Sequence, residues 1–152
     1  MDIQQRRNLI DSPAHIEVKL RQCCQNNYWN ATIEDRDAFN SEAFYTSVGS
    51  REILAVFKAG EKHTPQDRAF DIYLPRNIET NSYEINAPGS LIEIALTENF
   101  PAYHTYWAFK GVLNLVVNAN KQDYGGTFNI SFKDKEHREF VAEGSFAFSL
   151  QA

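Results

Sequence analysis

Few side chains in this sequence stand at spacings that a known chemical mechanism requires. The four histidines lie far apart along the chain, so no two of them have the spacing of neighbouring metal ligands. Cys23 and Cys24 are adjacent, and a pair of thiolates could hold a soft metal. A free cysteine more often serves as a small buried apolar side chain, and adjacent cysteines rarely bridge. The sequence therefore predicts no metal site and no cofactor.

Carboxylates are the second group that could act chemically, since a pair of them across a cleft can cleave a glycosidic bond. Each candidate falls at an expected turn or on the polar face of an expected strand, so we expect all of them to be solvated. These carboxylates are Asp67, Asp71, Glu79, Glu84, Glu93 and Glu98. Signatures of phosphate loops, dinucleotide loops, nucleophile elbows and zinc proteases are absent from the sequence. An enzyme would need a site assembled from distant residues, in which His104 or His137 meets a carboxylate and a nucleophile.

One segment, from Phe100 to Phe109, is dense in aromatic residues. Pro101 ends the preceding strand, so the rings that follow should emerge rigidly at the rim of a sheet, where they could stack on a sugar or a partner. We expect Trp107 to turn inward as part of the core. The predicted binding residues are Tyr103, His104 and Tyr106. A strand buried on both faces explains the same residues and stays open as the alternative.

The elements that position these residues are expected to be mostly strands. Aromatic residues make up 13% of the chain, and broad rings pack well on a pleated sheet. Runs with a period of two, such as Phe128–Phe132 and Phe140–Leu150, predict an antiparallel hairpin with an aromatic inner face. Residues 103–118 form one bent strand or two, with a bulge or bend at Gly111. The predicted core contains Phe57, Ile72, Leu74, Ile94, Leu115, Phe128, Ile130, Phe132, Phe146 and Phe148.

These patterns predict an all-β fold, an antiparallel β-sandwich of roughly seven to ten strands, with an eight-stranded β-barrel as the alternative. The sandwich domain spans residues 28–152. Residues 1–27 form an N-terminal segment that packs on it as a helix or an edge strand. Ser12 and Pro13 favour a helix start, whereas residues 15–21 alternate between polar and apolar as a strand does. The helix is the interpretation we favour.

Charge and hydropathy narrow the range of partners. The formal net charge is −5 and the 15 Lys and Arg residues are scattered, so no basic stripe is available to bind nucleic acid. No run approaches the roughly 18 apolar residues that a membrane-spanning helix requires. Asp11 follows Arg6 and Arg7 before any apolar stretch, so no export signal is predicted. We expect a soluble, cytoplasmic protein, although an exported chain whose signal had been removed would look the same.

Several short runs have a pattern found in a known group of proteins. These runs are Trp29–Thr32, Ile53–Phe57, Phe70–Leu74, Gly111–Leu115, Gly125–Ile130 and Glu143–Phe146. Together they resemble strands of uncharacterised bacterial β-sandwich proteins, some of which are described as lipoproteins. The resemblance covers about residues 28–150 and implies the sandwich fold and a bacterial origin, but no activity. This chain departs from that group in one respect: no cysteine follows an apolar segment, so a lipid anchor is not expected.

Three classes of function are compatible with these observations. The favoured one is a non-catalytic binding or protein-interaction module, because a rigid sandwich presents loops and edge strands to a partner. The second is a small-ligand carrier with an aromatic-lined cavity. The third is a hydrolase-type enzyme with a site assembled from distant residues. The sequence names neither the protein partner nor the small ligand.

Overall fold

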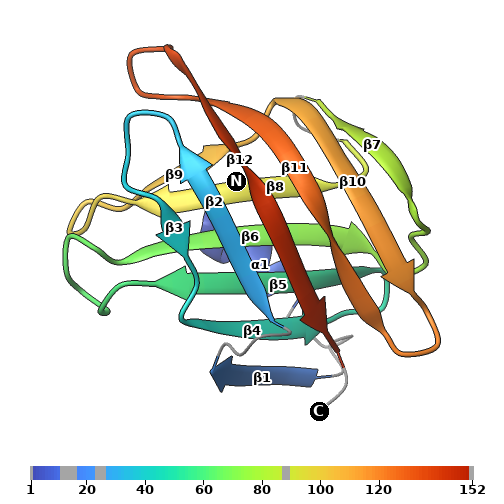
Figure 1. Cartoon of the computed structure of the whole chain (residues 1–152). Helices are drawn as coiled ribbons and strands as arrows, with labels where there is room; N and C mark the ends of the chain where they lie inside the picture. Colours follow the sequence, from blue (N-terminus) through green and yellow to red (C-terminus); the bar gives the residue numbers. More distant parts are fainter. Residues whose placement is uncertain (1, 11–16, 23–26, 87–89, 151–152) are drawn as a thin grey trace.

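The computed structural model describes residues 2–10, 17–22, 27–86 and 90–150, which form two antiparallel sheets and one short helix (Figure 1). In spatial order, the first sheet contains β1 (Glu17–Gln22), β4 (Ala43–Val48), β5 (Glu52–Ala59), β6 (Arg68–Pro75), β8 (Glu93–Glu98) and β9 (His104–Trp107). The second contains β3 (Phe39–Asn40), β2 (Tyr28–Ile33), β12 (Glu139–Ser149), β11 (Asp123–Lys133), β10 (Lys110–Asn118) and β7 (Asn81–Ile85). The predicted sandwich is confirmed. No described strand of one sheet pairs with a strand of the other, so the sheets do not close into a barrel.

The aromatic residues fill the space between the two sheets, and Trp29 on β2 lies at the centre of this core. Its indole stacks on the rings of Phe70, Phe128 and Phe146, with ring centroids 4.9, 4.6 and 5.1 Å away. Offset stacks of this kind add to the free energy of burial. All ten predicted core residues are buried. The predicted hairpin is confirmed as β11 and β12, whose register places Phe132 opposite Phe140.

Residues 103–118, expected as one bent strand or two, form two strands that belong to different sheets. The chain crosses between the sheets after β9: the Ala108 N–H donates to a carbonyl of β8 at 2.9 Å, and the Phe109 N–H donates to a carbonyl of β11 at 3.0 Å. Gly111, the second residue of β10, has a φ of +127°, and a Cβ at this position would lie 2.2 Å from the Asn129 carbonyl oxygen. The change of direction therefore occurs just before the glycine that the sequence suggested. The structure has twelve described strands, more than the roughly seven to ten expected, and this division accounts for part of the difference.

The N-terminal residues differ from the favoured interpretation. Residues 17–22 form the edge strand β1, which pairs antiparallel with β4. The expectation of a helix there is therefore wrong, and the alternation of polar and apolar residues indicated the strand. A helix occurs earlier, as α1 (Ile3–Ile10). Asp2 and Gln5 cap it reciprocally, each side chain accepting a hydrogen bond from the other's backbone N–H, at 2.8 and 3.2 Å. The suggested helix start at residues 12–13 and both cysteines lie outside the described residues.

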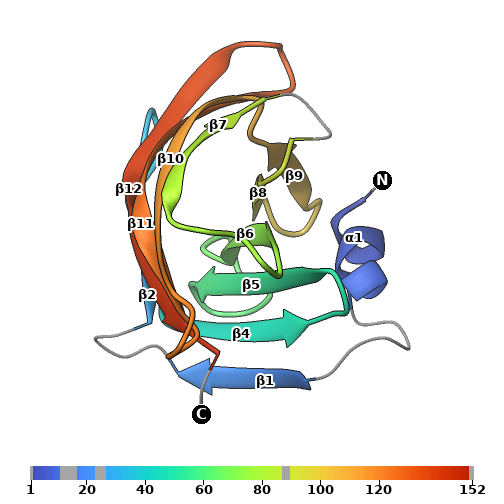
Figure 2. The ribbon, with the colours of Figure 1, turned by 90° about the vertical axis from the view of Figure 1, so that its right-hand side faces the viewer.

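Helix α1 lies on the outer face of the first sheet, the face turned away from the second sheet (Figure 2). A second, smaller apolar cluster fills this contact, with Ile3 of α1 and Trp107 packed against it. Its buried members are Leu54, Val56, Ala69 and Tyr73. The first sheet is therefore buried on both faces, which explains why β5 is apolar at consecutive positions. Among the described residues no helix is long and apolar enough to cross a membrane.

Asp71 on β6 is fully buried beneath α1, which contradicts the expectation of a solvated carboxylate. Arg7 of α1 donates to both carboxylate oxygens, at 2.7 and 2.6 Å, and the Tyr73 hydroxyl donates to one of them at 2.9 Å. Burial alone would lower the pKa of Arg7, but Asp71 raises it above its ordinary value. The expectation for Asp71 failed because it did not include the helix that covers this face. Asp67 and Glu98 are buried as well, with other partners: Tyr103 donates to Asp67, and Arg36 pairs with Glu98 at 2.8 Å.

Candidate functional site

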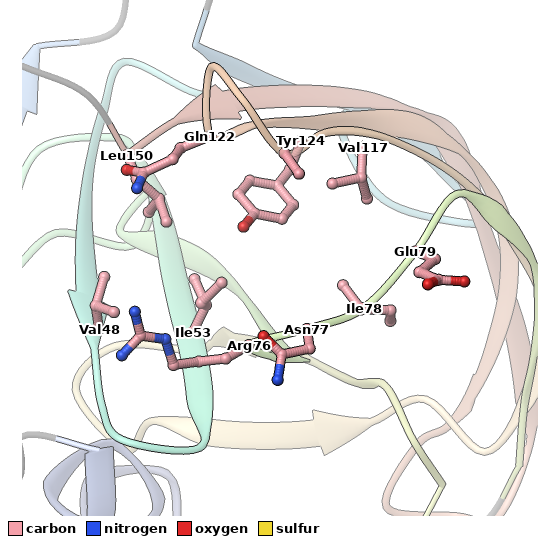
Figure 3. Close-up of a pocket in the computed structure, with 11 residues that line it drawn as sticks. Val48, Ile53, Arg76, Asn77, Ile78, Glu79, Val117, Gln122, Tyr124 and Leu150 are labelled. Atoms are coloured by element: carbon pink, nitrogen blue, oxygen red, sulfur yellow. The ribbon is translucent and has the colours of Figure 1, made fainter.

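A partly enclosed cavity of about 580 Å³ opens at one end of the sandwich (Figure 3). Four separate parts of the chain surround it: the ends of β4 and β5, the link between β6 and β7, the turn between β10 and β11, and the residue that follows β12. Sites for small ligands commonly have volumes of about 300–1,000 Å³. The cavity is therefore large enough for a small organic molecule.

The apolar part of the lining comes from both sheets and the links at their ends. Ile53 at the start of β5 and Ile78 in the β6–β7 link are buried, and three half-buried aliphatic residues complete this surface. Those three are Val48, Val117 and Leu150. Aliphatic side chains of this kind favour a ligand with an apolar portion, because binding removes that portion from contact with water.

Tyr124 places a polar group inside this apolar surface. It lies near the start of β11, its ring stacks on Phe148 of β12 with centroids 5.2 Å apart, and only 8% of the residue is exposed. Figure 3 shows its hydroxyl directed toward the middle of the cavity. The hydroxyl makes no hydrogen bond with any residue that the structure describes. Burial raises the pKa of Tyr124 and the charge of Arg76 opposes this rise, so the group stays a neutral donor near pH 7.

Arg76 and Glu79 provide the charges of the site, from opposite sides of the cavity (Figure 3). One guanidinium nitrogen of Arg76 donates to the Gly49 carbonyl at 3.3 Å. A guanidinium carries five N–H donors, so most of them stay available. Among the described residues no carboxylate lies within ion-pair distance of Arg76. Its charge is therefore free to meet an anionic group of a ligand.

Hydrogen bonds hold the walls of the cavity in place. The Thr80 hydroxyl accepts from the Val117 N–H at 2.8 Å and lies 3.3 Å from the Val117 carbonyl oxygen, so it continues the pairing of β7 with β10 to the residue before the first residue of β7. On the opposite wall, the Leu150 N–H donates to the Gln122 carbonyl at 3.0 Å. The Tyr83 hydroxyl donates to the Glu79 carbonyl at 2.6 Å. The site is thus formed before a ligand arrives, which lowers the entropic cost of binding.

The residues predicted to bind a partner lie away from this cavity, and one of them is not at the surface. Tyr106 is only 5% exposed and meets the Phe140 ring edge-on, with centroids 5.4 Å apart, so the expectation that it faces outward is wrong. In the β8–β9 register Tyr106 lies opposite Leu96, and directly paired residues share a face of the sheet. Trp107 consequently points to the outer face, beside Tyr73, and not into the main core.

Tyr103 and His104 are more accessible. Tyr103 is 45% exposed and donates a short hydrogen bond from its hydroxyl to Asp67. His104 is half-buried and packs on the Tyr106 ring, with centroids 4.4 Å apart. Tyr103 borders a smaller pocket of about 270 Å³ next to α1. A binding role for these two residues stays a prediction.

Comparison with protein-family models, with curated proteins and with solved structures finds no match for this chain. The resemblance to bacterial sandwich proteins therefore stays a prediction. The geometry of the cavity carries the functional argument alone.

Sequence reasoning missed Tyr124, although a signal was present. The inward face of β11 alternates through Phe128, Ile130 and Phe132, and the same period extended back to position 124 puts a phenol on that face at the end of the sheet. An inward phenol at a sheet end faces the opening of a sandwich and not its middle. The sequence around Arg76 predicts only a turn, so it did not indicate that Arg76 lines a binding site.

Proposed function

We propose that this protein is a binding module for a small organic ligand and that the cavity at the end of the sandwich is its site. The supporting observation is a preformed cavity into which the Tyr124 hydroxyl points without a partner among the described residues. A ligand that carries an acceptor oxygen can take the hydrogen bond of this hydroxyl. The proposal corresponds to the small-ligand carrier among the sequence-based hypotheses, with one difference. The aromatic surplus fills the core, and among the described residues Tyr124 is the one aromatic residue that borders the cavity.

A role in binding another protein has less support from the described residues. Such a role would draw on an exposed apolar patch or an unprotected edge strand. Three edge strands are short: β3 has two residues, β9 has four and β7 has five, and Thr80 continues the pairing beyond β7. The large apolar side chains that are exposed come from separate elements, apart from Val112 and Val116 on β10.

A hydrolase site also lacks support. His104 packs against Tyr106, and His137 is exposed in the turn between β11 and β12. Neither histidine borders the cavity. Among the described residues no three His, Cys, Asp or Glu side chains gather as a metal site would require.

A fluorescence titration of the full chain with anilinonaphthalene sulfonate tests the proposal. Val117→Phe would place a ring in the cavity, because Val117 lines it. Val116→Phe is the matched control, because the neighbouring side chain points to the opposite face of β10 and is 63% exposed. We expect saturable binding by the wild type and by V116F, and at least a tenfold loss of affinity in V117F. Equal binding by the two variants, at equal melting temperatures, would contradict the proposal.

A further inference from the structure

We infer that the cavity selects an aliphatic monocarboxylic acid, held by its carboxylate at Arg76 and Tyr124 and by its chain against the apolar lining. This inference rests on the proposed function and adds the chemical class of the ligand. It follows from three properties of the site: the kind of donors it offers, the balance of its charges and the shape of its apolar surface.

The donors come first. Tyr124 as a whole residue is 8% exposed, and its hydroxyl points into the cavity with no partner among the described residues. An acceptor oxygen of a ligand in the cavity can take the hydrogen bond of this hydroxyl. The guanidinium of Arg76 offers a planar set of further donors that matches a carboxylate in geometry and charge. Its charge also acts on the Tyr124 hydroxyl, so one anionic group can interact with both residues.

The charges limit the ligand to one negative group. In the described part of the chain, Arg76 and Glu79 are the charged residues of the lining, and they stand on opposite sides of the cavity (Figure 3). A carboxylate at Arg76 is compensated by one positive charge. A second carboxylate at the other end of the ligand would approach Glu79, and like charges at short range repel. A phosphate monoester, with nearly two negative charges, would exceed the charge of Arg76 for the same reason.

The apolar surface favours a flexible aliphatic chain. Its members, among them Ile53, Ile78 and Leu150, are aliphatic and come from several directions, so they offer no flat face on which a planar ring could stack. The one aromatic ring of the lining is already stacked on Phe148. A medium-length alkyl chain can adapt to this irregular surface, and the cavity of about 580 Å³ can contain it.

Displacement of anilinonaphthalene sulfonate by four unbranched probes, each with ten carbon atoms, tests the inference. The probes are decanoate, decanol, decylammonium and decanedioate. We expect decanoate to bind at least tenfold more tightly than each of the other three. We also expect decanoate binding to weaken as the pH falls through the pKa of the free acid, while decanol binding stays constant.

Three variants of the full chain assign the effect to the proposed residues. Arg76→Gln and Tyr124→Phe should each weaken decanoate binding at least tenfold. Arg76→Gln should leave decanol binding unchanged, and Tyr124→Phe should weaken decanol binding less than decanoate binding, because the hydrogen bond that decanol loses is a neutral one. Arg51→Gln is the control: it removes the same charge from an exposed position outside the cavity and should leave both affinities unchanged. Melting temperatures of all three variants check that the fold is intact.

The outcomes separate the two proposals. If decanol binds as tightly as decanoate, or if R76Q and Y124F bind decanoate normally, the carboxylate class is wrong while the binding function stands. The wild type could also bind the dye, and V117F not, while decanoate fails to displace the dye from the wild type. In that case too the carboxylate class is wrong while the binding function stands. If neither the dye nor any probe binds to the wild type, the proposed function fails together with the ligand class.

Discussion

Replacing Arg7 with alanine should destabilise the protein by about 3–5 kcal/mol, because it leaves the carboxylate of Asp71 buried without its cation. The structure gives the magnitude. Arg7 makes two hydrogen bonds to Asp71, at 2.6 and 2.7 Å, and hydrogen bonds to charged groups contribute about 1.5–3 kcal/mol each. The Tyr73 hydroxyl stays on Asp71 at 2.9 Å but supplies no charge. Detachment of α1 would let water reach Asp71, so the loss is limited by the free energy with which the helix docks.

Urea unfolding followed by tryptophan fluorescence measures this loss, with Arg51→Ala as the control because Arg51 is exposed. The control should change the free energy of unfolding by less than about 0.5 kcal/mol. The double variant R7L/D71L should be more stable than R7A, because it leaves no uncompensated buried charge, although the Tyr73 hydroxyl loses its acceptor. A loss below about 1 kcal/mol for R7A would refute the reasoning, since it would mean that Arg7 does not compensate a buried charge.

Three further predictions concern the core and the pH dependence of stability. Phe146→Ala should cost about 3–5 kcal/mol in urea unfolding, because the ring is buried against Trp29, and a cost under about 1 kcal/mol would contradict its place in the core. Tyr106→Ala should also lower the free energy of unfolding, by about 3 kcal/mol, because the ring is buried, and an unchanged melting temperature would instead support the outward orientation that the sequence suggested. The hydrogen bond from Tyr103 lowers the pKa of Asp67 against the opposing effect of burial. A carboxyl group whose pKa is lowered in the folded state contributes stability above its ordinary pKa, and this contribution disappears as the pH falls through the lowered value. Asp67→Asn should therefore flatten the acid side of a plot of unfolding free energy against pH, and an acid limb identical to that of the wild type would argue against this contribution.

The strands could be predicted where one side of the alternation is polar. Along β11, polar Asn129 and Ser131 alternate with Phe128, Ile130 and Phe132, so the period identifies both the strand and its inward face. The segment around Tyr106 and Trp107 is aromatic on both sides of the alternation, so its period carries no information about which face is inward. The pairing of β9 with β8 decides that orientation, and pairing is a property of the whole sheet.

Helix α1 shows a second reason why part of the fold could not be predicted from the sequence. Its start carries a capping signal, the reciprocal pairing of Asp2 with Gln5, but its sequence IQQRRNLI has no continuous apolar face. The helix is held to the sheet by ion pairs as well as by apolar contacts, including Arg6 with Glu52 at 2.8 Å. The charge partners lie on strands far along the chain, so the sequence near α1 could not indicate them. The burial of Asp71 was missed for the same reason.

The candidate site could be predicted least of all. Its lining combines Ile53, Arg76, Val117, Tyr124 and Leu150, which come together only when the ends of both sheets are in place. Each of them taken alone is an ordinary strand or turn residue. The aromatic segment could be proposed as a site from the sequence because its residues are neighbours along the chain. The cavity is made from residues that are neighbours only in space.

A heteronuclear NMR titration of the full chain with anilinonaphthalene sulfonate tests the central claim most directly, because it locates the binding site without assuming the class of ligand. The account predicts that the largest chemical-shift changes occur at the backbone amides of residues 76–79, 122–124 and 150, around the cavity. It also predicts that the amides of residues 103–106 change little. Changes concentrated at residues 103–106, or spread over the surface with none around Tyr124, would contradict it.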